Sequence, residues 1–115
     1  MASFFIFWYN NLMKPKIEIL SPKEIKEKLK DFPGWIYKKN KISKEFILPS
    51  FNDVIKLINL LAPYCNRIDH HPDIHIFYNK VLFELQRFDI GGKVTSRDFL
   101  VAEKIEELYQ KVKGK

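Results

Sequence analysis

The stretch Asp69-His70-His71-Pro72-Asp73 decides how the rest of this 115-residue chain is interpreted. Pro72 prevents the two histidines from continuing a helix. An amphipathic helical pattern ends just before them, and the pattern of a β-hairpin begins just after them. Because imidazole exchanges protons near neutral pH, two histidines at an enforced bend are the first candidates for chemistry.

The segment before the histidines predicts a long helix. Ser50 is placed to cap it, and Asp53 stands at its third position. Pro63 falls inside the pattern, which predicts a kink or an early end there. Cys65, the single cysteine, lies on the apolar stripe and is expected to be a buried structural thiol. The stripe has helical spacing and consists of Phe51, Val54, Ile55, Ile58, Leu61, Ala62 and Cys65.

The segment after the histidines predicts two strands, residues 74–78 and 81–88, joined near Asn79-Lys80. Alternate residues from Val81 onward are apolar, which is typical of a strand with one buried face. Gly91-Gly92 ends this hairpin, and Thr95-Ser96-Arg97-Asp98 is a cap for a final helix. The apolar face of that helix consists of Val101, Ala102, Ile105, Leu108, Tyr109 and Val112.

The N-terminal half adds one more helix and one more hairpin. The helix begins after Ser21, with Glu24 placed to complete a capping box, and Pro33-Gly34 ends it. Residues 35–37 and 42–48 then flank a polar turn. The order is therefore α-β-β-α-β-β-α. It predicts an α+β fold in which three helices pack on one face of a four-stranded, mainly antiparallel sheet.

Composition indicates one packed, soluble domain. Hydrophobic residues make up 46% of the chain, and the net charge is +6. Lysine supplies 17 of the 20 basic residues, which favours a solvated surface over a nucleic-acid patch rich in arginine. A lone cysteine fits a cytoplasmic location. We expect no nucleic-acid partner and no membrane association.

The first thirteen residues stand apart from this domain. The aromatic run in residues 4–9 is too short to span a bilayer, and it lacks the flanks of a signal peptide. Met13 followed by Lys14-Pro15-Lys16 would make an ordinary translation start. We therefore hypothesise that translation starts at Met13, and we divide the chain into an N-terminal extension, residues 1–13, with a mis-assigned start, and a domain, residues 14–115.

The residues alone leave three interpretations of the paired histidines. His70 and His71 could bond to the last carbonyls of the preceding helix. In an extended segment, His71, Asp73 and His75 would point to one side and could bind a metal. The third interpretation is general acid–base catalysis, which suits a chain with no activated serine or cysteine arrangement.

The layout around the histidines resembles the pterin-4a-carbinolamine dehydratase family. The resemblance covers roughly residues 17 to 112 and includes Tyr78-Asn79-Lys80-Val81 and Asp89-Ile90-Gly91-Gly92. It implies the α+β fold described above, a homodimer or homotetramer, and no cofactor, since the pterin is the substrate. The implied reaction is dehydration of 4a-hydroxytetrahydropterin to quinonoid dihydropterin, a step of tetrahydropterin recycling, by histidine acid/base catalysis.

The resemblance also implies roles for individual residues. His70 takes the place of the histidine that does the acid–base work, while His71 and Pro72 shape the pterin pocket. The expected catalytic residues are thus His70 and His71, with no metal ligands. The expected substrate-binding residues are Asp69, Pro72, Asp73, Tyr78, Phe88 and Asp98.

Three positions depart from the family pattern. Asn66 replaces an acidic residue, Phe88 replaces a third histidine, and Lys93 is an extra residue after the glycine turn. Because phenylalanine cannot move a proton, these departures imply a weak hydro-lyase or a non-catalytic relative. The alternative function is therefore a binding module, such as a dimerisation cofactor or an assembly factor.

Overall fold

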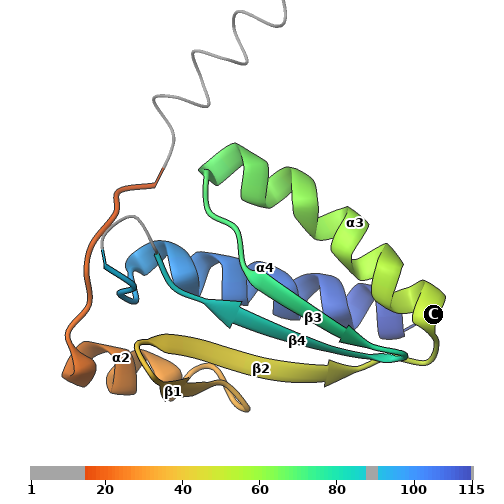
Figure 1. The fold of residues 1–115 in the computed structure, drawn as a ribbon, viewed down its shortest axis with the longest axis horizontal. Coiled ribbons are helices and arrows are strands. Elements are labelled where there is room, and N and C mark those ends of the chain that lie inside the picture. The colour runs from red at the N-terminus through yellow and green to blue at the C-terminus, as the bar shows by residue number, and fades with distance from the viewer. Residues whose placement is uncertain (1–14, 88–90, 115) are drawn as a thin grey trace, which may run out of the picture.

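The computed structural model describes residues 15–87 and 91–114, so the expectation for the N-terminal extension lies outside the described residues. The expected α+β order is confirmed (Figure 1). The elements are α2 (Pro22–Leu29), β1 (Ile36–Lys38), β2 (Lys41–Ile47), α3 (Phe51–Ile68), β3 (Asp73–Phe77), β4 (Lys80–Leu85) and α4 (Ser96–Lys113). Within the described ranges, no helix is long and apolar enough to cross a membrane.

The four strands form one antiparallel sheet in the order β1-β2-β4-β3. Its central pair, β2 and β4, places Phe46 opposite Val81, and both side chains are buried. Helices α3 and α4 cover this apolar side of the sheet (Figure 1). Helix α2 joins the same core through buried Ile25 and is followed by Phe32, whose ring packs edge-on against Phe99 of α4. The core therefore lies between one sheet face and the helices.

Helix α3 matters most for the site because its C-terminal end leads directly into the histidines. Ser50 caps it as expected, accepting a hydrogen bond from the Asp53 N–H at 3.2 Å. Of the two alternatives predicted at Pro63, a kink or an early end, the early end does not occur, because the helix continues to Ile68. Pro63 is exposed, so the backbone bond that proline cannot make lies on the solvent side. The buried stripe that holds the helix comprises Val54, Leu57, Leu61, Cys65 and Ile68.

Cys65 is confirmed as a buried thiol within this stripe. Burial raises the pKa of its thiol to about 11. Since the thiolate is the reactive form, Cys65 is an inert packing residue at neutral pH.

The sheet face opposite the helices carries an ion-pair chain. The Glu84 carboxylate accepts from Lys41 Nζ at 2.8 Å and lies 2.9 Å from His75 Nε2. The Lys41 ammonium lowers the pKa of Glu84 most strongly, partial burial opposes this shift, and His75 adds to the lowering. The chain links all three long strands, because these residues stand on β2, β3 and β4.

We expect Glu84→Gln to destabilise the fold more at about pH 7 than at about pH 3, because the pKa of Glu84 is lowered in the folded state. A carboxyl whose folded-state pKa is lowered stabilises the fold above its ordinary value of 4.5, and this stabilisation is lost as the pH falls through the folded-state value. Urea unfolding at both pH values measures the difference. Glu45→Gln, an exposed change on the same sheet face, is the control. A loss of stability that does not depend on pH would contradict the expectation.

Candidate functional site

The site begins where α3 ends, at a reversal of the chain direction. Asp69 adopts the left-handed conformation (φ 54°, ψ 51°), which aspartate tolerates better than most residues. The His70 N–H donates to the Cys65 carbonyl at 3.0 Å, as in a helix C-terminal motif. Two successive histidines are thereby folded back toward the last turn of α3.

Pro72 and Asp73 carry the chain from this reversal into the sheet. Proline restricts the residue before it to extended conformations, so the backbone of His71 has little freedom. Pro72 is half-buried. Asp73 is exposed and is the first residue of β3, where its backbone lies opposite that of Glu84 in the register of the sheet. His70 and His71 thus sit between two rigid elements, which restrains the positions of both imidazoles.

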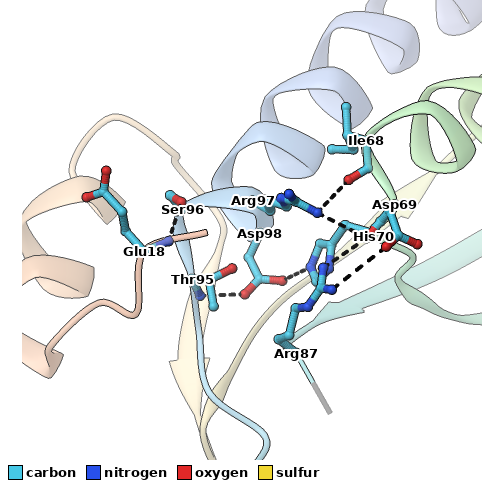
Figure 2. Close-up of polar contacts among 9 residues, drawn as sticks. All are labelled: Glu18, Ile68, Asp69, His70, Arg87, Thr95, Ser96, Arg97 and Asp98. Atoms are coloured by element: carbon cyan, nitrogen blue, oxygen red, sulfur yellow. Dashed lines mark hydrogen bonds and ion pairs between the residues drawn. The ribbon is translucent and has the colours of Figure 1, made fainter. Parts of the chain in front are cut away.

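His70 points into the protein and pairs with Asp98 of α4 (Figure 2). Its side chain is 4% exposed and that of Asp98 is fully buried. One carboxylate oxygen, Oδ1, contacts His70 Nε2, while the other, Oδ2, accepts from the Thr95 N–H at 2.7 Å. Asp98 therefore satisfies a free N–H at the start of α4 and holds the imidazole at the end of α3.

His71 lies in a different environment. Its side chain is exposed, and Nε2 lies 2.8 Å from Oδ1 of Asn66 in the last turn of α3. Adjacent imidazoles are thus held by unlike partners: His70 by a buried carboxylate and His71 by an exposed neutral amide.

Two arginines fix the end of α3 (Figure 2). Arg97, which is 7% exposed, donates from Nη1 to the Ile68 carbonyl at 2.8 Å. Its Nε and Nη2 donate to the Pro15 carbonyl at 2.9 and 2.7 Å. Arg87 donates from Nη1 to the Asp69 carbonyl at 2.9 Å. Helix carbonyls that lack intrahelical partners are in this way bonded to cations, which favours the geometry on which the histidines depend.

The structure brings together five of the predicted site residues. Asp69, His70, His71, Pro72 and Asp98 all lie where the end of α3 meets the start of α4, and Asp73 adjoins them at the start of β3.

Two predicted residues are not part of this cluster. Tyr78 occupies the β3–β4 turn, at the opposite end of β3 from Pro72, and is 73% exposed. Phe88 lies outside the described residues.

Sequence reasoning did not find the role of Arg97. A signal for it exists, because a cation in the first turn of a helix faces the positive end of the helix dipole. Arg97 stands in that unfavourable place on α4 because its guanidinium reaches the C-terminal carbonyls of α3. The sequence also did not predict the hydrogen bond between Asn66 and His71, because Asn66 is notable in the sequence only as a departure from the family pattern.

The metal-binding interpretation of His71, Asp73 and His75 finds no support in the geometry. His75 bonds to Glu84 on the open face of the sheet, whereas His71 bonds to Asn66. In residues 15–87 and 91–114, no three His, Cys, Asp or Glu side chains are grouped as metal ligands would be.

The arrangement is suited to moving protons. A carboxylate at one nitrogen of an imidazole orients the ring, fixes its tautomer and stabilises the imidazolium, leaving the other nitrogen to exchange a proton. The pair formed by His70 and Asp98 meets this description, and an exposed second imidazole stands next to it in the chain.

Comparison with known proteins identifies the family of this chain. The family model for pterin 4 alpha carbinolamine dehydratase matches residues 18–108. A relative from Sulfurisphaera tokodaii, whose name refers to pterin-4-alpha-carbinolamine dehydratase, is 40% identical over 89 residues, 77% of this chain and 95% of that protein. A relative from Roseiflexus with the same name is 42% identical with the same coverage.

Solved structures show the same fold. A protein from Brucella melitensis described as a transcriptional coactivator/pterin dehydratase superposes with a TM-score of 0.75 at 26% identity, covering 80% of this chain and 99% of that one. A pterin dehydratase-like protein described as a RuBisCO assembly factor gives a TM-score of 0.52 at 18% identity, covering 65% and 86%, and shows the fold alone. By the extent of these matches, the chain belongs to the pterin 4 alpha carbinolamine dehydratase family.

Proposed function

We propose that this protein dehydrates 4a-hydroxytetrahydropterin to quinonoid dihydropterin by histidine acid/base catalysis, in tetrahydropterin recycling. The observation that carries the proposal is the buried pair of His70 and Asp98 beside exposed His71, in a chain of this family. The reaction breaks the bond between the ring carbon and its hydroxyl. It needs a proton on the leaving oxygen and removal of a proton from the neighbouring ring nitrogen.

The two histidines would divide these proton transfers. His70 is assigned the principal acid–base role, because the Asp98 carboxylate holds its Nε2 and leaves Nδ1 for exchange with the substrate. His71, which is exposed, would orient the pterin and handle the second proton. The elimination breaks the C–O bond and the neighbouring N–H bond, forms a C=N double bond in their place and releases water. No net oxidation or reduction occurs, so the chemistry requires neither a metal nor a redox cofactor.

Contacts to the pterin are proposed for residues around these imidazoles. Asp69, Pro72 and Asp73 flank the histidines in the chain, and Asp98 acts through His70. Tyr78 and Phe88 are proposed from the family pattern alone, since the structure places one at the far end of β3 and does not describe the other. We also propose a cytoplasmic homodimer or homotetramer with no nucleic-acid partner. The exposed Phe77 on edge strand β3 supports self-association.

Stopped-flow measurement with authentic 4a-carbinolamine tests the proposal. We expect the protein to accelerate dehydration well above the rate in buffer. Because Phe88 stands where the family pattern has a third histidine, we expect this acceleration to be smaller than that of a family member with all three histidines. A rate equal to that in buffer alone, at a protein concentration well above that of the substrate, would refute catalysis.

A non-catalytic binding module is the second candidate. The similar solved structure is described as a transcriptional coactivator/pterin dehydratase, so the fold is compatible with a binding role as well as with catalysis. The observation that favours the binding module is that Asn66 and Phe88 replace an acidic residue and a histidine of the family pattern. A ligand that binds only the native state must raise the melting temperature, so a pterin analogue discriminates between the two functions. No thermal shift at concentrations well above the micromolar range, together with a co-purifying protein, would favour the binding module.

A further inference from the structure

The side chain of Asn66 contacts the imidazole of His71, one of the two proposed catalytic residues. Asn66 stands in the last turn of α3, and the chain reversal at Asp69 returns His71 to it. The Asn66 Oδ1 and the His71 Nε2 lie 2.8 Å apart, within hydrogen-bond distance. Both side chains are exposed, so the bond is accessible to substrate and solvent rather than part of the core.

The chemistry of this contact determines which nitrogen of His71 carries the proton. An amide oxygen only accepts hydrogen bonds, so the ring nitrogen facing it must donate. A neutral imidazole with a protonated Nε2 carries its lone pair on Nδ1. Pro72 limits the backbone freedom of His71, and the hydrogen bond to Asn66 then restrains the orientation of the imidazole ring.

We propose that Asn66 is a positioning residue that holds His71 as its Nε2-protonated tautomer and leaves Nδ1 as the proton-accepting atom facing the pterin. The part of the inference that concerns the pterin rests on the proposed dehydration. The same arrangement occurs at His70, where Asp98 occupies Nε2. Both imidazoles are then anchored through Nε2, and both present Nδ1 for proton exchange.

Nitrogen-15 NMR of the histidine rings tests the tautomer directly. The chain has three histidines, so His71→Gln identifies the signals of His71. Spectra are recorded at about pH 8.5, above the ordinary imidazole pKa, where the neutral tautomers are observed. We expect the wild type to show mainly the Nε2-protonated form. Asn66→Ala should lower the ratio of the two tautomers about threefold to tenfold, the range expected for one exposed hydrogen bond.

Two further variants make the result specific. Asn66→Asp retains an acceptor at the same place and should keep the wild-type tautomer. Asn59→Ala removes an exposed asparagine two turns earlier on the same helix and should change nothing at His71. An unchanged tautomer ratio in Asn66→Ala, or a wild type protonated mainly at Nδ1, would overturn the inference.

Activity provides the second measurement. Asn66→Ala should reduce kcat for the carbinolamine about threefold to tenfold, with recovery in Asn66→Asp. Wild-type kcat in Asn66→Ala would refute the role in catalysis. If the wild type has no dehydratase activity, the proposed function fails by that result, and the NMR ratio still decides whether Asn66 fixes His71.

Discussion

His70→Gln is expected to lower the rate of carbinolamine dehydration by about 10²–10⁴-fold, the usual contribution of one positioned acid–base group. Glutamine can still donate a hydrogen bond to the Asp98 carboxylate, so the buried acceptor keeps a partner. It cannot exchange a proton as imidazole does. The variant therefore removes proton transfer while largely preserving the contact between α3 and α4, and stopped-flow kinetics with authentic carbinolamine measures the loss.

Two other histidine variants make this loss interpretable. His75→Gln alters an exposed imidazole that bonds to Glu84 on the open sheet face, and it should retain the wild-type rate. His71→Ala should reduce the rate with little change in stability, because His71 is exposed. A His70→Gln variant that keeps the wild-type rate would remove His70 from the mechanism, and a severe loss confined to His71→Ala would transfer the principal role to His71.

The secondary structure could be predicted because its signals are local. Ser21 and Glu24 form the expected capping box, with bonds of 3.2 and 2.9 Å. The apolar residues that alternate from Val81 to Leu85 form the buried side of β4, as predicted. These patterns depend on residues a few positions apart, so they can be recognised without knowledge of the tertiary structure. The early end that was one of two alternatives at Pro63 does not occur, because the apolar stripe of α3 outweighs one missing hydrogen bond.

The contacts of the site could not be predicted in the same way. His70 and Asp98 are 28 positions apart in the chain, and only the packing of α3 against α4 brings them together. Arg97 reaches back 29 positions to Ile68 and 82 positions to Pro15. No periodicity encodes such distances. The family resemblance indicated that Asp98 matters, but it did not show that its carboxylate faces His70 rather than an open pocket.

Asp98 consequently serves stability and the site with the same side chain. Its Oδ2 completes the start of α4, and its Oδ1 holds the imidazole proposed to move protons. Burying a carboxylate completely is costly unless it is paired and hydrogen-bonded. The Asp98 carboxylate therefore depends on the His70 imidazole and the Thr95 N–H, and both of these groups depend on the carboxylate. This mutual dependence predicts an unusually large stability effect for a single substitution.

Asp98→Ala is expected to lower the free energy of unfolding by about 3–5 kcal/mol, the usual loss when one member of a buried pair is removed. The change leaves the His70 imidazole and the Thr95 N–H buried without their carboxylate. Urea unfolding at neutral pH measures the difference. For a domain with a total stability of about 5–15 kcal/mol, the variant is near the limit of folding, so Asp98→Asn provides a milder second measurement.

Asp53→Ala is the matched control, because Asp53 occupies the same position in the first turn of α3, a helix as long as α4. Its carboxylate is half-buried and accepts from the Ser50 hydroxyl at 2.9 Å, with no imidazole involved. Its loss should cost about 0.5–1 kcal/mol, as expected for a carboxylate near a helix N-terminus. The excess cost of Asp98→Ala over Asp53→Ala then isolates what burial and the contact with His70 contribute. Equal costs would show that Asp98 is only a helix cap, and the coupling between stability and the proton-transfer site would be refuted.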